Sequence, residues 1–207
     1  MSEDNNKTGI IIAFLIIAVI FLVIILTKTF SDEKQRNETF VNTENDIEST
    51  NRYSKNGISF VYPSNYKITG EEVDENGIFD LTCEIKGSDV SQIEITTFSA
   101  DMFLNLSTDD VKFVCVNSME SVQEELQKNV FYKNSTFSEI KEGLLGKWTC
   151  YQKNFSASML GVTVYGFIKE KIFDNGTMLI VTAIYENDNN KQTLEQIEQS
   201  ICLEQYE

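Results

Sequence analysis

Lys171 to Tyr185 reads KIFDNGTMLIVTAIY and is the stretch that decides the fold. The runs Val162–Phe173 and Thr177–Tyr185 are rich in β-branched and aromatic residues, which favour strands. Asp174-Asn175-Gly176 lies between them, and Asn-Gly in such a place is a strong hairpin signal. The sequence therefore predicts two antiparallel strands here, in a sheet that is largely antiparallel.

The rest of the chain adds further strands and two helices to this hairpin. The pattern predicts a helix that begins near Ser107 and ends near Lys128, and a C-terminal helix with Leu194 and Ile201 on one face. Other expected strands cover Ile58–Tyr62, Tyr66–Ile68, Phe79–Ile85, Ile93–Thr97 and Leu144–Phe155. This order predicts an α+β fold in which helices cover a mainly antiparallel sheet.

A continuous apolar run lies near the N-terminus. Every residue from Gly9 to Leu26 is apolar (GIIIAFLIIAVIFLVIIL), and a helix of that length nearly spans the hydrocarbon core of a bilayer. The sequence predicts a short tail at 1–8, a transmembrane anchor helix at 9–27 that contacts the lipid bilayer, a polar linker at 28–52, and a soluble domain at 53–207. The alternative for the apolar run is a cleaved signal peptide, but no A-x-A-like site follows it.

The orientation of the anchor rests on opposing signals. Lys7 precedes the helix, whereas Lys28, Lys34 and Arg36 follow it, so the positive-inside rule alone would place the domain in the cytoplasm. The cysteines, the glycosylation sequons and the family resemblance described below favour a domain outside the cytoplasm instead.

Charge and composition exclude several classes of function. The formal net charge is −15, and an acidic surface argues against nucleic-acid binding, which needs a clustered basic face. The chain has no histidine, the commonest general base and metal ligand. We therefore expect no catalytic residues, no cofactor and no metal site.

Two sets of residues are candidates for covalent modification. An even number of cysteines outside the cell would allow two disulfides in any of three connectivities, and the alternative is four buried thiols. The cysteines are Cys83, Cys115, Cys150 and Cys202. The Asn-x-Ser/Thr sequons that could carry glycans are at Asn37, Asn105, Asn134, Asn154 and Asn175.

Two segments resemble PsbP-like domains. The first is Gly57–Tyr66, GISFVYPSNY, in which an aromatic strand is followed by Tyr-Pro-Ser and a further aromatic residue. The second is the hairpin Ile172–Ala183 with the helix Leu194–Ile201 after it. The resemblance implies an α/β/α sandwich around a mainly antiparallel sheet. It also implies an extracytoplasmic, anchored protein that is not an enzyme.

These observations favour a membrane-anchored, extracytoplasmic, non-enzymatic binding or accessory domain of unknown ligand and partner. One alternative is an anchored hydrolase with two converging carboxylates, one of them desolvated. Another is a structural or sensor domain that acts through self-assembly.

Overall fold

The computed structural model describes residues 49–75, 77–86, 90–129, 132–159 and 161–204. The predicted tail, the anchor at 9–27, nearly all of the linker and the sequon at Asn37 lie outside the described residues. Within the described ranges, no helix has the length and apolar character needed to cross a membrane.

The described residues form strands, two α-helices and one short 3-10 helix. In chain order these are β1 (Thr50–Lys55), β2 (Ile58–Pro63), β3 (Tyr66–Val73), β4 (Phe79–Ile85), β5 (Gln92–Ser99), η1 (Asp101–Phe103), α2 (Thr108–Lys128), β6 (Tyr132–Phe137), β7 (Lys141–Leu145), β8 (Trp148–Met159), β9 (Val162–Ile172), β10 (Thr177–Tyr185), α3 (Asp188–Gln199) and β11 (Cys202–Leu203).

The strands form two antiparallel sheets. A large, 8-stranded sheet has the order β3-β4-β5-β10-β9-β8-β6, with β7 also paired to β8. A small, 3-stranded sheet has the order β1-β2-β11. The predicted mainly antiparallel α+β fold is therefore confirmed, and the second sheet is an addition to it.

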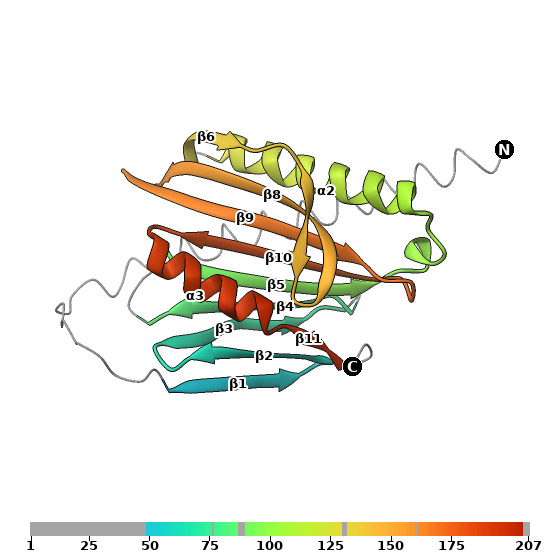
Figure 1. Cartoon of the computed structure of the whole chain (residues 1–207), viewed down its shortest axis with the longest axis horizontal. Helices are drawn as coiled ribbons and strands as arrows, with labels where there is room; N and C mark the ends of the chain where they lie inside the picture. Colours follow the sequence, from blue (N-terminus) through green and yellow to red (C-terminus); the bar gives the residue numbers. More distant parts are fainter. Residues whose placement is uncertain (1–48, 76, 87–89, 130–131, 160, 205–207) are drawn as a thin grey trace.

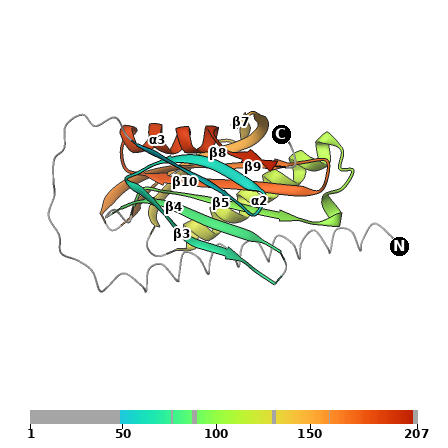
Figure 2. The same ribbon diagram turned by 90° about the horizontal axis from the view of Figure 1, so that it is seen from below.

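The two helices lie on opposite faces of the large sheet (Figures 1 and 2). One core packs α2 against the sheet, with Met119 and Val122 of the helix beside Ile168 and Ile180 of the strands. The other packs α3 and the small sheet against the opposite face. The layers are therefore α2, the large sheet, and then α3 together with β1, β2 and β11.

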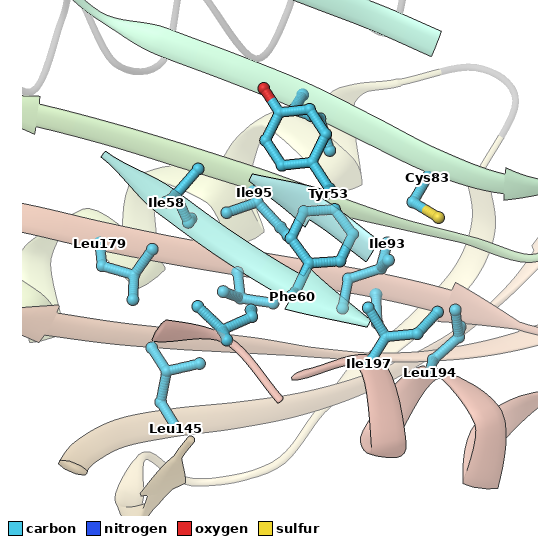
Figure 3. Packing of buried hydrophobic residues seen from close by; sticks show 14 of the residues in the cluster. Tyr53, Ile58, Phe60, Cys83, Ile93, Ile95, Leu145, Leu179, Leu194 and Ile197 are labelled. Carbon is cyan, nitrogen blue, oxygen red and sulfur yellow. The ribbon is translucent and has the colours of Figure 1, made fainter. Parts of the chain in front are cut away.

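Figure 3 shows the core on the α3 side. Phe60 of β2 and Ile197 of α3 point toward Ile93 and Ile95 of β5, and each of these four side chains is at most 1% exposed. Burying an aliphatic or aromatic side chain of this size contributes about 1.5–3 kcal/mol. The small sheet is therefore held by its apolar face, and removal of that face would expose the centre of the large sheet.

The central hairpin forms as predicted, and the four residues from Phe173 to Gly176 join its strands. The Gly176 amide donates to the Phe173 carbonyl at 2.9 Å, and Gly176 has a φ of 80°. A tight turn followed by a left-handed glycine is one of the common ways to join antiparallel strands. An added Cβ at Gly176 would lie 2.9 Å from the Ala100 carbonyl oxygen, so both space and backbone favour glycine here.

The strands differ from the prediction in several places. The strand β1 begins at Thr50, so Thr50–Arg52 belong to the fold and not to the linker at 28–52. The expected run Leu144–Phe155 is divided between β7 and β8 by a turn at Gly146, which has a φ of 55°. The edge strand β6 was not predicted, because its sequence YKNSTF is mostly polar and the strand is irregular at Asn134.

Candidate functional site

An open groove of about 500 Å³ runs between α2 and the segment that contains β6 and the residues after it. In Figure 1, α2 lies beside β6 at one edge of the large sheet. The helix contributes Val116, Glu120, Gln123 and Gln127 to the groove. The opposite wall is formed by Ser135, Phe137, Ser138, Glu139 and Ile140, and Lys153 of β8 completes the lining.

The periodicity of α2 places these groups. The helix begins with a capping box, in which Ser107 and Asp110 each bond the other's backbone amide. The inner face buries Val114, Met119 and Val122 against the sheet. The groove residues, from Val116 to Gln127, follow at helical spacing on the neighbouring stripe. A helix that is fixed by its core face thus presents amide and carboxylate groups along the groove.

Lys153 is the most buried charged group that lines the groove. It is 7% exposed, and its ammonium lies 5.7 Å from the centroid of the Phe137 ring. Burial holds the pKa of Lys153 below its usual value, and the nearby Glu120 carboxylate acts in the opposite direction. Among the described residues its ammonium has no ion pair or hydrogen bond, although the ring face gives it a cation–π contact.

A second polar cluster lies beneath α2. Glu170 of β9 is fully buried and accepts a hydrogen bond from the Ser118 hydroxyl at 2.8 Å. Burial raises the pKa of Glu170 to about 8, and the Ser118 hydrogen bond opposes this only in part. Its other carboxylate oxygen has no hydrogen-bond partner in the described part of the chain. Glu170 therefore carries a proton at neutral pH.

Glu94 of β5 is also buried, at 6% exposed, and a further buried glutamate, Glu198, belongs to the opposite face of the sheet from Glu170. Glu198 of α3 is 1% exposed and pairs with Lys169 at 2.6 Å. It also accepts a hydrogen bond from the Gly146 amide at 2.9 Å. Because Glu170 faces α2 and Glu198 belongs to α3, the two carboxyl groups are separated by the sheet and do not converge.

All four cysteines are free thiols in the structure. Cys83, Cys115 and Cys150 are buried, and Cys83 points into the core on the α3 side (Figure 3). Burial raises the pKa of Cys83 to about 12 and that of Cys150 to about 11, and it also raises the pKa of Cys115. Since the thiolate is the reactive form, these three thiols are poor nucleophiles. Cys83 and Cys115 belong to different cores, so they do not lie next to each other.

The four described sequon asparagines are all exposed, as a glycan acceptor must be. Asn105 precedes α2, Asn134 lies in β6, Asn154 in β8 and Asn175 in the central hairpin. Their use stays a prediction. The sequons are spread over the domain, and none of their asparagines lines the groove, although Ser135 of the sequon at Asn134 does.

The sequence reasoning missed both Lys153 and Glu170. The available signal was the period of two along a strand, because Lys153 alternates with Tyr151 and Phe155 and so shares their face. That spacing places the lysine stem among aromatic side chains. It does not reveal that α2 leaves an opening there, since this depends on packing between distant segments.

The fold was compared with known proteins. No protein-family model and no curated protein matches the chain. The solution structure of cyanobacterial PsbP (CyanoP) from Synechocystis is similar, with a TM-score of 0.52 and 12% identity over 79% of this chain and 98% of that chain. A protein from Bacteroides thetaiotaomicron has a TM-score of 0.46 and 12% identity, over 71% of this chain and 45% of that chain.

LpqN, involved in cell envelope biogenesis of Mycobacterium tuberculosis, has a TM-score of 0.39 and 11% identity, over 76% of this chain and 92% of that chain. Of these three structures, CyanoP alone has a TM-score above 0.5, and the similarity covers nearly the whole of that protein. The mainly antiparallel sheet with a helix on each face agrees with the fold that the resemblance of Gly57–Tyr66 and Ile172–Ala183 implied. The described domain therefore has the PsbP-like fold.

Proposed function

We propose that this chain is a single-pass membrane protein whose PsbP-like domain acts outside the cytoplasm as a non-catalytic binding module. The groove between α2 and β6 is the observation that carries the binding role, because it combines apolar contacts with a recessed cation. Concave sites of a few hundred cubic ångströms with a small number of polar groups are typical of ligand-binding pockets.

The proposed transmembrane anchor is supported by the sequence. The uncharged run Gly9–Leu26 favours lipid over water, since its Ile, Leu, Phe and Val side chains each contribute about −0.3 to −0.6 kcal/mol at the middle of a membrane helix. The exposed positions of Asn105, Asn134, Asn154 and Asn175 are compatible with a domain outside the cytoplasm. For the hydrolase alternative, Glu170 and Glu198 cannot act as a pair, because they lie on opposite faces of the sheet.

Labelling of an introduced cysteine on intact cells tests the topology. Thr149 is exposed on β8, away from the groove, and Thr149→Cys would place a reactive thiol there. The parent chain is the matched control, because three of its thiols are buried and the fourth, Cys202, is half-buried. We expect a membrane-impermeant maleimide to label the variant on intact cells, with little labelling of the parent.

Two results would contradict the proposed topology. If Thr149→Cys were labelled only after the cells are permeabilised, the domain would face the cytoplasm. If the full chain with its original N-terminus were recovered in the soluble fraction without detergent, the anchor would be refuted.

A further inference from the structure

We propose that the groove between α2 and β6 binds a small monocarboxylate with an apolar body, and that Lys153 pairs with its carboxylate. This inference rests on the proposed binding function and adds the chemical class of the ligand. It starts from Lys153, which lines the groove although more than nine-tenths of its surface is buried.

The first step concerns the missing counter-ion. Lys153 buries its apolar stem, whereas its ammonium keeps contact with solvent in the groove and has no opposite charge within ion-pair distance in the described part of the chain. Among the described residues, Lys153 has only the Phe137 ring at 5.7 Å and the electrostatic field of Glu120, with which it forms no ion pair. An anion that enters the groove would supply the missing partner, and a carboxylate accepts the short, charge-assisted hydrogen bonds that an ammonium donates.

The second step concerns the body of the ligand. Val116, Phe137 and Ile140 offer apolar surface in the same groove, and Gln123 and Gln127 of α2 offer neutral amides. The cavity volume of about 500 Å³ is that of a small-molecule site. A carboxylate attached to an aromatic or short aliphatic group would satisfy the cation and cover this apolar surface together.

The third step concerns the number of charges on the ligand. Glu120 and Glu139 also line the groove, and the chain as a whole has a net charge of −15. Like charges in one site repel, so a second negative charge on the ligand would be unfavourable. The groove is therefore suited to a monoanion and not to phosphate or a dicarboxylate.

Acetylation of lysines in the full chain, reconstituted in lipid nanodiscs, tests the site directly. The probes are phenylacetate, its neutral analogue phenylacetamide, and inorganic phosphate, each at millimolar concentration. Lys133 is the internal control, because it is exposed on β6. We expect phenylacetate to slow acetylation of Lys153 at least threefold, as read by peptide mass spectrometry, and to leave Lys133 unchanged. Phenylacetamide and phosphate should protect neither lysine.

A pair of variants checks the same contact from the protein side. Lys153→Met keeps the apolar stem and removes the charge, so the fold should persist, and a thermal melt verifies this. The saturation-transfer NMR signal of phenylacetate should fall at least fivefold in Lys153→Met and stay unchanged in Lys133→Met. If Lys153→Met failed to fold, the acetylation result would decide.

Three results would overturn the inference. They are equal protection by phenylacetamide, equal protection by phosphate, and no protection by phenylacetate. Equal protection by phenylacetamide would leave the groove as a binding site and refute only the carboxylate. The topology of the proposed function is tested separately through Thr149→Cys, so the two failures are distinguishable.

Discussion

Glu170 shows what a single buried carboxyl group does to stability. Its pKa is raised to about 8 by burial under α2, whereas the same group titrates near 4.5 when exposed. Between these values the folded chain keeps a proton that the unfolded chain has lost. The free energy of unfolding therefore falls as the pH rises from about 4.5 to about 8, by up to about 1.4 kcal/mol per pH unit.

Glu170→Gln should remove this pH dependence. Glutamine has nearly the same shape, can still accept the hydrogen bond from Ser118, and does not ionise. We expect the variant to be more stable than the parent at pH 8, by several kcal/mol, with the difference closing near pH 5. Urea denaturation at unit pH steps measures this. Glu124→Gln is the control, because that side chain is 68% exposed. Parallel pH profiles for parent and Glu170→Gln would contradict the burial argument.

Gly166 marks a place in β9 where the sheet has no room for a side chain. A Cβ there would collide with the Phe155 ring and with the Ala183 carbonyl, and the carbonyl belongs to the backbone of a central strand. Gly166→Ala should therefore destabilise the domain by about 1–3 kcal/mol, the usual cost of overpacking. Gly143→Ala is the matched control, since its Cβ would meet only the flexible Gln152 side chain. Equal urea midpoints for the two variants would refute the steric explanation.

At the scale of elements, α3 is attached to the sheet by a buried ion pair. Glu198 accepts from the Lys169 ammonium and the Gly146 amide, and Lys169 also donates to the Leu144 carbonyl at 2.8 Å. One carboxylate thus joins the helix to β9 and to the turn between β7 and β8. The Lys169 side chain is only 12% exposed, so water does not easily replace a lost partner.

Removal of this carboxylate should loosen α3. Glu198→Ala leaves the Lys169 ammonium without its counter-charge and the Gly146 amide without its acceptor, and we expect a loss of about 3–5 kcal/mol in the free energy of unfolding. Glu195→Ala on the same helix is the control, because its pair with Lys191 is 3.9 Å long and exposed. That change should cost less than about 1 kcal/mol. Thermal melts compare the two, and similar losses would show that the buried pair contributes no more than the exposed one.

The elements also show which parts of the fold could be predicted. The helix α2 was predictable from both its period and its Ser107 cap, because these are local properties of the chain. The polar edge strand β6 was not, since its strand form depends on pairing with β8 some twenty residues later. The candidate groove lies between these two elements. The helix that forms one wall of the groove was therefore predictable from the sequence. The strand that forms the other wall, and the position of Lys153, depend on tertiary packing and were not.

Over the whole molecule, the two cores are joined by strands that contribute to both. Along β10, Leu179, Val181 and Ala183 face the core on the α3 side, whereas Ile180 and Ile184 face α2. Loss of packing on one face therefore releases strands that the other face requires. Small domains in which elements depend on one another in this way unfold as a single cooperative unit.

A change under α2 should therefore be reported by a probe on the opposite face. The single tryptophan, Trp148, packs on the α3 side against Phe173, with ring centroids 5.2 Å apart. Met119→Ala empties fully buried space under α2 and should cost about 2–5 kcal/mol. Tryptophan fluorescence and far-ultraviolet circular dichroism should shift to the same lower urea midpoint, while the exposed change Lys112→Ala moves neither. If the tryptophan transition stayed at the parent midpoint while the helical signal shifted, the faces would unfold separately, and the sheet would not couple the groove to the rest of the domain.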